Sequence, residues 1–353
     1  MTNKILFVVS AKTPTGVIAS QVLTLAEQVK SRSERDVVVW LIGRKEPSHL
    51  FSTVNVTLEY KENLSCLLKV KRSKIYFRGY DLFLKGFLLL LGRKNTTLYD
   101  FRALVYLESF FRYKSIARKS VLFFMELLVY LLADNLTCVS NNLKDTLISA
   151  FKVRRQIFVY PCLNSHTTIL KKEVDLKTKR VFRFVYVGGM AEWQRVEEII
   201  FIYERLRKDL EGTLTIITNE IARAKEICAV SKESIEIKSL SHKEVLMDLP
   251  NYDFGFLLRD CDIINRVASP IKFLEYISNL IIPILSNCVG DYSEEVKKYK
   301  LGIILDNNYA IDINEILKLT EDSGVHKRLS QYYMSNYNVH KRIVNHPLIE
   351  LTI

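Results

Sequence analysis

Glycine, proline and tryptophan are scarce in this chain of 353 residues, which contains 12 Gly, 7 Pro and 2 Trp. So few Gly and Pro exclude a collagen-like repeat and a low-complexity disordered chain. Hydrophobic residues make up 48% and charged residues 25% of the sequence, values that are ordinary for a folded globular protein. Because one domain usually takes about 100–200 residues, the length predicts two domains.

Metal and redox motifs are missing as well. No two of the six cysteines have the spacing of a zinc or redox motif, and the six histidines show no metal-ligand spacing. Most of the cysteines lie in apolar runs, where a free thiol packs as a small hydrophobic group. We therefore expect reduced, structural cysteines in a cytosolic protein. The cysteines are Cys66, Cys138, Cys162, Cys228, Cys261 and Cys288.

Long apolar runs are also missing, because no stretch reaches the roughly 20 residues that a membrane-spanning helix needs. Two blocks come closest: residues 83–91, interrupted by Lys85, and residues 121–133, interrupted by Glu126. Cations flank both blocks, as in surfaces that dip into the headgroup layer of an anionic membrane. The alternative is a buried core helix beside a solvated basic face.

Negative charge is scarce in the first half of the chain. The formal net charge is +12, and residues 1–165 hold about 25 Lys and Arg against about 12 Asp and Glu. The remaining residues are close to neutral, with about 26 basic against about 27 acidic side chains. Such an excess suggests an anionic partner: nucleic acid, a membrane surface or a phosphorylated substrate. We expect no nucleic-acid partner, because the basic half holds no recognisable RNA- or DNA-binding module.

Strand and helix signals alternate along the chain, and a polar, Lys-rich segment at residues 161–180 divides them into two series. Two such series predict two doubly wound α/β domains, with the ligand between the carboxyl ends of their sheets. Neither a G-x-G-x-x-G nor a Walker motif is present. The predicted strands include residues 4–10, 36–42, 74–78, 136–139, 182–187, 214–218, 254–258 and 283–286, and the predicted helices include 17–29, 104–132, 141–151, 195–210, 269–279 and 314–344.

The segment 259–279 (RDCDIINRVASPIKFLEYISN) carries the sharpest chemical signal. Ser269 suits a helix N-cap and Pro270 the first helical position, and the free N–H groups of such a helix form an anion site. Lys272 can add a full charge to a phosphate, and Glu275 can accept two hydroxyl hydrogen bonds from a ribose. An anion clamp and a diol acceptor on one helix match a nucleoside diphosphate. The alternative is a capped amphipathic helix with a surface Lys–Glu pair.

The segment 186–195 (YVGGMAEWQR) carries a second signal. A strand that ends in Gly188 and Gly189 lets a ligand approach the backbone closely, and Gln194 and Arg195 can then reach that ligand. The alternative is that the glycines only make a turn and that Trp193 is a packing residue.

Together the two segments resemble bacterial glycosyltransferases of the GT-B fold, of the family 4 type, in the subgroup that assembles polysaccharide and lipopolysaccharide. The resemblance is carried by Y-V-G-G followed by W-Q, then by R-V-A-S-P-I-K-F-L-E-Y about 70 residues later. It implies two facing Rossmann-like domains with a cleft between them. Residues 1–165 would face the acceptor and the membrane, residues 166–353 would bind the nucleotide-sugar donor, and the last helix would pack back on the first domain.

The resemblance also implies roles for single residues. Glu275 matches the second glutamate of the family's E-x7-E motif, which binds the donor ribose, and Gly188–Gly189 matches the glycine turn below the diphosphate. The backbone amides of Ser269, Pro270, Ile271 and Lys272 match the stretch that holds the diphosphate. The first glutamate of the motif is replaced by Val267, and the family's two usual cations by Gly189 and Gln194. The cations that can replace them are Lys272, Arg266, Arg195 and Arg259.

Residues of the first half resemble segments that the subgroup places near the cleft. Asp100 and Arg102, in Y-D-F-R, would orient the acceptor or the leaving phosphate, and Asp100 is a candidate general base. Arg78, in F-R-G, and Gly16 would lie near the acceptor. The alternative for Asp100 and Arg102 is a solvated ion pair at the start of a helix.

The resemblance implies a retaining hexosyltransferase, located in the cytoplasm at the inner face of the cell membrane. Because the sequence shows no metal-ligand spacing, we expect a metal-independent reaction without a cofactor. It would transfer a sugar from a nucleotide-sugar, with a UDP-sugar favoured, to a polyprenyl-diphosphate-linked glycan in capsule, O-antigen or exopolysaccharide synthesis. Two alternatives stay open: a nucleotide-binding partner subunit without catalysis, and a sugar-nucleotide epimerase of the same fold.

Overall fold

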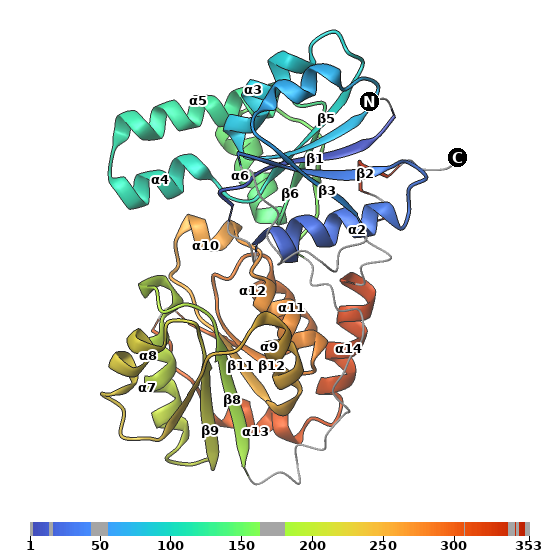
Figure 1. Ribbon diagram of the computed structural model, residues 1–353. Coiled ribbons are helices and arrows are strands. Elements are labelled where there is room, and N and C mark those ends of the chain that lie inside the picture. Colours follow the sequence, from blue (N-terminus) through green and yellow to red (C-terminus); the bar gives the residue numbers. More distant parts are fainter. Residues whose placement is uncertain are drawn as a thin grey trace. The chain divides into compact units, whose positions relative to one another are not determined.

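The structure, a computed structural model, describes residues 3–13, 17–43, 56–162, 181–306, 308–337, 343 and 346–349. The chain divides into two compact units (Figure 1). The first unit contains Met1–Ser165 and Val339–Ile353, and the second contains His166–Asn338. The division after residue 165 is the boundary that the sequence predicts, but the end of the chain belongs to the first unit.

The first unit is built on a seven-stranded sheet in the order β3-β2-β1-β4-β5-β6-β7, and all its strands are parallel. The central strands are almost entirely apolar and buried, as expected for a parallel sheet that is covered on both faces. Its strands are β1 (Ile5–Ser10), β2 (Val37–Ile42), β3 (Thr57–Lys61), β4 (Lys74–Arg78), β5 (Thr96–Phe101), β6 (Asn135–Cys138) and β7 (Ile157–Val159).

The helices of the first unit include one break that the sequence did not predict. Residues 104–132 form two helices, because Lys114 adopts a left-handed conformation (φ 53°) and Ser115 caps the second helix. The buried carboxylate of Glu126 then accepts hydrogen bonds from the backbone N–H groups of Val105 and Tyr106 and so caps the first helix. The helices are η1 (Ile18–Leu23), α2 (Thr24–Lys30), η3 (Leu64–Lys69), α3 (Tyr80–Leu90), α4 (Val105–Tyr113), α5 (Ile116–Leu132) and α6 (Asn141–Phe151).

The second unit repeats the plan with a six-stranded parallel sheet in the order β10-β9-β8-β11-β12-β13. Its strands are β8 (Phe182–Val187), β9 (Gly212–Ile217), β10 (Ile235–Lys238), β11 (Phe254–Leu257), β12 (Ile282–Ser286) and β13 (Ile303–Leu305). Its helices are η5 (Glu192–Gln194), α7 (Val196–Leu206), α8 (Ile221–Cys228), α9 (His242–Asp248), η6 (Leu249–Asn251), α10 (Ile263–Val267), α11 (Ile271–Ser278), α12 (Tyr292–Tyr299), α13 (Ile313–Glu321) and α14 (Val325–Asn336).

Helix α11 lies directly on this second sheet. Gly255 in β11 makes room for it, because a Cβ atom at that position would lie 2.6 Å from the ring of Tyr276. The Tyr276 hydroxyl donates a hydrogen bond to the carbonyl oxygen of Phe256 (3.1 Å) and accepts one from the N–H of Val187 (3.3 Å). These contacts fix α11 across the middle of the sheet, next to the ends of β8 and β11.

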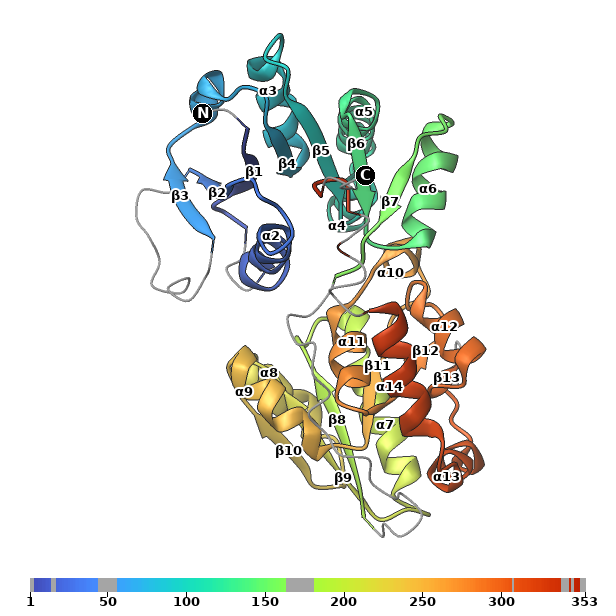
Figure 2. The same cartoon turned by 90° about the vertical axis from the view of Figure 1, so that its right-hand side faces the viewer.

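The end of the chain contributes to both units. The last described helix, α14, packs against α11 in the second unit (Figure 2), and Val339–Ile353 belong to the first unit, on which the end of the chain is expected to pack. The segment that joins the first unit follows α14. There Lys74 donates to the carbonyl oxygen of Leu348 (3.2 Å), and the ring of Tyr160 lies edge-on to that of His346 at 4.8 Å.

The cysteines depart from the prediction made from the sequence. Cys261 and Cys288 form a disulfide, so the expectation of reduced cysteines is wrong for this pair. They follow the neighbouring strands β11 and β12, whose ends bring the two Cα atoms to 5.2 Å, within the range that a disulfide spans. Cys66, Cys138, Cys162 and Cys228 remain thiols. Across the described part of the chain, each helix is too short or too polar to cross a bilayer.

Candidate functional site

The candidate donor site lies at the carboxyl edge of the second sheet, where ligands bind in doubly wound folds. Gly188 and Gly189 follow β8, Arg259 follows β11, and α11 begins at the same edge. The predicted residues that come together most closely are Gln194, Arg259 and Lys272.

Gln194 joins these two cations. Its side-chain oxygen Oε1 accepts hydrogen bonds from Lys272 Nζ (3.1 Å) and from the guanidinium of Arg259. The same oxygen lies 3.0 Å from the hydroxyl of Tyr186, which also donates to the carbonyl oxygen of Gly189 (2.6 Å). Gln194 therefore holds two cations in place at a position where the resemblance leads us to expect a single cation.

The two cations lie in surroundings that disfavour their charge. Burial lowers the pKa of Lys272 well below its usual value, and the charge of Arg259 lowers it further, while Glu275 raises it. Burial also lowers the pKa of Arg259. Within the described ranges neither cation forms an ion pair with a carboxylate. A bound anion would relieve both effects, so the pair is suited to a diphosphate.

The two glycines after β8 make room for side chains. A Cβ atom on Gly188 would lie 2.0 Å from Lys272 Nζ, and one on Gly189 would lie 2.7 Å from Glu220 Oε1. The Glu220 carboxylate accepts a hydrogen bond from the N–H of Met190 (3.0 Å) and fixes the turn. Close approach to the backbone was predicted for a ligand. In the structure the groups that approach it are the side chains of Lys272 and Glu220.

The start of α11 differs from the prediction. Pro270, and not Ser269, is the N-cap residue, and no side chain caps the helix. The Ser269 hydroxyl lies 2.8 Å from the hydroxyl of Tyr292 and is buried with it. The first N–H groups of α11, beginning at Ile271, therefore lack a capping side chain, which leaves the anion site predicted at this helix end in place.

Glu275 lies one turn further along α11 and is only 3% exposed. Burial raises its pKa to about 7, although the charge of Lys272 lowers it. Nδ1 of His242 lies 3.9 Å from Glu275 Oε1. Sequence reasoning missed His242, but a signal was present: it opens the helix after β10, at the same carboxyl edge as the other site residues.

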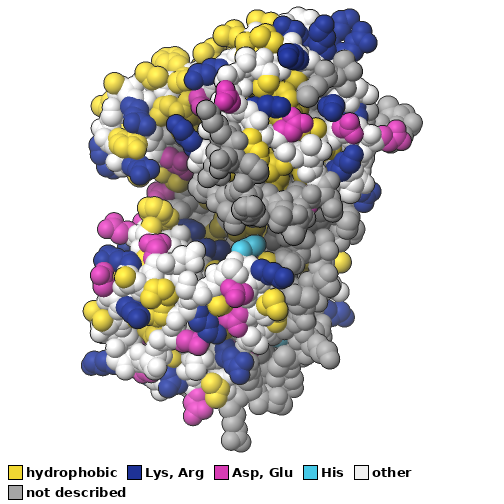
Figure 3. All heavy atoms as spheres, in the orientation of Figure 1, with side chains coloured by type: hydrophobic (Ala, Val, Ile, Leu, Met, Phe, Trp, Pro, Cys, Tyr) yellow, Lys and Arg dark blue, Asp and Glu magenta, His cyan; other side chains and the backbone are white. Residues whose placement is uncertain are grey.

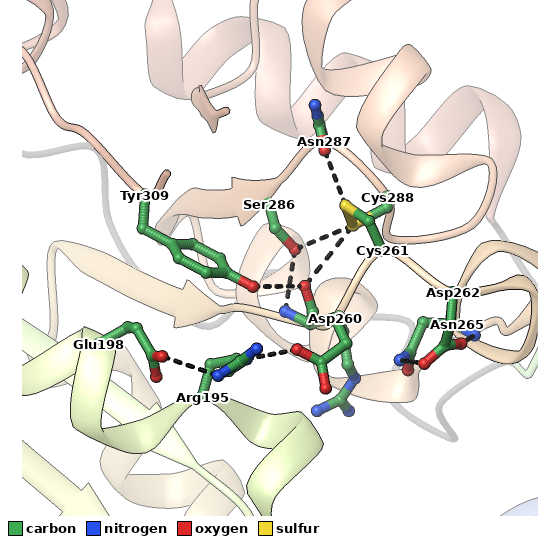
Figure 4. Close-up of polar contacts among 11 residues, drawn as sticks. Arg195, Glu198, Asp260, Cys261, Asp262, Asn265, Ser286, Asn287, Cys288 and Tyr309 are labelled. Atoms are coloured by element: carbon green, nitrogen blue, oxygen red, sulfur yellow. Dashed lines mark hydrogen bonds and ion pairs between the residues drawn. A yellow bond between two sulfur atoms is a disulfide. The ribbon is translucent and has the colours of Figure 1, made fainter. Parts of the chain in front are cut away.

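Arg195 and Arg266 are not part of the cation pair. Arg195 forms ion pairs with Asp260 and with Glu198 (2.9 Å), as Figure 4 shows, so its charge is already balanced. Arg266 is exposed on α10. Val267 beside it is buried, 2% exposed, at the position where the resemblance leads us to look for a glutamate.

Asp260 and Asp262 stand two residues apart, a spacing that can serve a metal ion and that sequence reasoning passed over. Asp260 pairs with Arg195, whereas Asp262 accepts hydrogen bonds from the backbone and side-chain nitrogens of Asn265 (2.8 and 3.0 Å). The two carboxylates thus serve separate partners (Figure 4). Over the described ranges, no three His, Cys, Asp or Glu side chains gather as metal ligands.

The backbone of Arg259 is held by its neighbours. Its N–H donates to the Ser286 hydroxyl (2.9 Å), and its carbonyl oxygen accepts a hydrogen bond from the hydroxyl of Tyr309 (3.0 Å). The disulfide from Cys261 to Cys288 ties the same loop to the end of β12 (Figure 4). The loop that positions Arg259 is therefore anchored on both sides.

In the first unit, Asp100 and Arg102 form a buried pair and not the solvated pair that was the alternative. Asp100 is 2% exposed and accepts hydrogen bonds from Arg102, from the hydroxyl of Tyr76 and from that of Thr137 (2.9 Å). Burial alone would raise the pKa of Asp100, but the charges of Arg102 and Arg78 and the hydrogen bonds from Tyr76 and Arg102 together outweigh it, so the pKa is lowered. These contacts suit an anchor for the end of β5 better than a general base.

A pocket of about 370 Å³ lies at the carboxyl edge of the first sheet. Arg78, Asp100 and Arg102 line it, so the three acceptor-side residues that the sequence singled out and the structure describes are brought together. Gly16, the fourth, lies outside the described residues.

Comparison with known proteins gives no match in sequence: neither a protein-family model nor a curated protein sequence matches this chain. Solved structures do match. HepE of Anabaena, solved with UDP-glucose, has a TM-score of 0.71 at 12% identity over 96% of this chain and 98% of its own. Sucrose-phosphate synthase of Thermosynechococcus elongatus has a TM-score of 0.64 at 13% identity over 97% and 94%. A glycosyltransferase of Rickettsia africae has a TM-score of 0.66 at 12% identity over 97% and 96%.

This chain has the GT-B fold. Both Rossmann-like units contribute to the match, because it covers nearly the whole chain. The GT-B fold confirms the predicted fold class, and the carboxyl edges of its two sheets are where the candidate residues lie.

Proposed function

We propose that this protein is a retaining, metal-independent glycosyltransferase that takes a hexose from a nucleotide-sugar, with a UDP-sugar favoured. The observation that carries the proposal is the pair of cations, the buried Arg259 and the partly buried Lys272, that Gln194 holds beside the uncapped end of α11. The solved structures with the same fold include HepE with UDP-glucose and an Escherichia coli protein with UDP-2-fluoro glucose.

Different residues of the second unit bind the diphosphate and the ribose of the nucleoside diphosphate. Arg259, Lys272 and the N–H groups at the start of α11 bind the diphosphate and stabilise the negative charge that grows on it as the sugar leaves. Burial lowers the pKa of Lys272, and the negative charge of a bound diphosphate raises it again, which favours the charged ammonium in the complex. Glu275 ionises to accept hydrogen bonds from the ribose hydroxyls. The acceptor hydroxyl attacks the anomeric carbon on the face that the diphosphate leaves, without a protein nucleophile. The bond from this carbon to the diphosphate oxygen breaks, and the leaving phosphate takes up the proton of the hydroxyl.

Calorimetric titration with UDP tests the donor site. Lys272→Met removes the positive charge, and Glu275→Gln removes the negative charge and replaces one of the two acceptor oxygens by a donor group, so each should weaken UDP binding at least tenfold. Lys327→Met and Glu315→Gln make the same chemical changes at exposed positions of the same unit and should leave the affinity within twofold of wild type. UDP affinity that is unchanged in Lys272→Met would sink the diphosphate assignment.

One observation favours a second candidate, a nucleotide-binding partner subunit without catalysis. The position that holds a sugar-binding glutamate in the family is the buried Val267, which offers no hydrogen bond through its side chain. UDP binding together with the absence of product from nucleotide-sugars and lipid-linked acceptors would favour this candidate. Release of UDP that depends on the acceptor would exclude it.

For the acceptor we propose a polyprenyl-diphosphate-linked glycan at the cytoplasmic face of an anionic membrane. The membrane contact is the α4–α5 patch, which consists of exposed apolar residues beside cations. Figure 3 shows hydrophobic and basic side chains together over these helices. The apolar members include Ile116 (72% exposed), Val121 (59%), Phe124 (62%) and Leu128 (48%), and the cations are Arg112, Lys114, Arg118 and Lys119.

The two apolar blocks of the sequence contribute to both the core and the surface. Phe83 and Leu90 are buried, whereas Leu88 and Leu91 are 68% and 58% exposed. In the second block, residues 121–133, the exposed members belong to the α4–α5 patch, and Val129 is fully buried. An amphipathic helix with cations on its border suits the interface of an anionic bilayer.

Vesicle sedimentation tests this contact. We expect binding to vesicles that contain phosphatidylglycerol, weaker binding at high salt, and little binding to phosphatidylcholine alone. Phe124→Ser should reduce binding, whereas Phe201→Ser, at a site 57% exposed in the second unit, should not. Equal binding of both variants, or binding to neutral vesicles at high salt, would contradict the α4–α5 patch.

A further inference from the structure

The pocket of the first unit is rich in positive charge. Lys12, Arg78 and Arg102 line it, against the carboxylates of Asp81 and Asp100. Asp100 is already engaged by Arg102, Tyr76 and Thr137, so its charge is balanced inside the wall of the pocket. Of the other charged residues that line the pocket, Lys12 and Arg78 are positive and Asp81 is negative, so the net charge of the lining is positive.

Arg78 is the cation with the greatest need of a partner. Its Nη1 atom is buried, and among the described residues no acceptor forms a hydrogen bond with it. A buried N–H group without an acceptor is destabilising, and more so when the group is charged. Arg78 ends β4 and its side chain lines the pocket, so a small turn of the guanidinium brings Nη1 to a ligand there, which can supply the missing acceptor.

The first turn of α3 borders the same space. Gly79, with φ 109°, turns the chain directly from Arg78 into α3, and no side chain caps this helix. Gly79, Tyr80 and Asp81 all line the pocket. The free N–H groups and the positive end of the helix dipole favour an anion there, and they add to the charge of Arg78. The carboxylate of Asp81 disfavours an anion at this place, but Asp81 is exposed and its side chain can turn into solvent.

We propose that this pocket binds a phosphate group of the acceptor, with Arg78 as the residue that selects it. A guanidinium matches the geometry of a phosphate and binds it through two parallel hydrogen bonds. The inference rests on the proposed glycosyl transfer and extends it: the acceptor carries a phosphate close to the hydroxyl that receives the sugar. This phosphate is separate from the diphosphate of the donor, which is assigned to the second unit.

The experiment uses the full chain saturated with UDP, so that the donor site is filled before the second ligand is added. Glucose 6-phosphate and a short-chain polyprenyl phosphate in detergent are titrated in separate calorimetric runs. We expect at least one of the two to bind, and Arg78→Gln to weaken that binding at least tenfold. Arg154→Gln, on an exposed arginine before β7 at the opposite edge of the sheet, should leave it within twofold.

The outcomes separate the inference from the proposed function. Binding of glucose 6-phosphate identifies a soluble sugar phosphate, and binding of polyprenyl phosphate alone identifies a lipid-linked phosphate. Both support the inference if they depend on Arg78. The inference is overturned if neither ligand binds, or if Arg78→Gln binds the ligand as tightly as wild type does. Unchanged UDP affinity in the same variant means that the proposed donor site is unaffected. If Arg78→Gln does not fold, Arg78→Lys, which keeps the charge but loses the paired hydrogen bonds, should still bind several-fold more weakly.

Discussion

Replacing Gly188 by alanine is expected to disable the donor site without touching a charged residue. The added Cβ atom would lie 2.0 Å from Lys272 Nζ and 2.9 Å from its Cε. Real carbon contacts are longer than about 3 Å, so the ammonium group has to move by about 1 Å or more. It then leaves the hydrogen bond of 3.1 Å with Gln194 that places it beside Arg259.

The size of the effect follows from the contact that is lost. A hydrogen bond to a charged group contributes about 1.5–3 kcal/mol. Since about 1.4 kcal/mol corresponds to a factor of ten, UDP should bind about 10- to 150-fold more weakly to Gly188→Ala. The loss should resemble that of Lys272→Met. The double variant should bind no more weakly than Lys272→Met alone, because both changes remove the same contact.

The assay is calorimetric titration with UDP at neutral pH. Gly324→Ala is the matched control, because its Cβ would meet only the ends of the Arg328 and Asp322 side chains, at 3.2 Å. It should bind UDP like the wild type. The reasoning is refuted if folded Gly188→Ala binds UDP within twofold of wild type, or if its loss adds fully to that of Lys272→Met.

Three further predictions concern stability, measured by urea unfolding. Burial raises the pKa of Glu126 to about 7, above its value near 4.5 in the unfolded chain, so stability should fall by roughly 3 kcal/mol as pH rises from 4.5 to above 7. Glu126→Gln should remove this slope, and an unchanged slope would contradict it. Asp100→Asn should destabilise the first unit by about 3–5 kcal/mol, because it leaves Arg102 without its charged partner. If Asp100 were purely catalytic, the urea concentration at half-unfolding would not change. Cys261→Ser opens a loop closed across 27 residues and should lower the free energy of unfolding by about 3.5 kcal/mol. Wild type treated with a dithiol should show the same loss, and Cys228→Ser should not.

The strands and the two-unit plan could be predicted because they depend on local composition. Continuous apolar runs such as residues 5–9 and 37–42 suit only a strand that is covered on both faces, and their alternation with helices allows few topologies. The break between α4 and α5 could not be predicted, because a lysine at residue 114 adopts the left-handed conformation that usually marks a glycine.

For the candidate donor site, the sequence named Gln194, Arg259 and Lys272 but not the contacts that join them. Ser269 has the right chemistry for a cap, but its hydroxyl meets Tyr292, which is 23 residues away in sequence. Gln194 looked like the loss of a cation, whereas in the structure it gathers two cations from other elements. His242 and the pairing of Cys261 depend on which strands lie side by side, which spacing along the chain does not reveal.

The disulfide from Cys261 to Cys288 closes the chain into a covalent ring that contains α10, α11 and β12. Ser269, Lys272 and Glu275 all lie inside this ring, between its two cysteines. A protease that cuts once within the ring breaks the backbone but releases no fragment. The nicked protein keeps its full mass on a denaturing gel and separates into two pieces only after a thiol has reduced the bond.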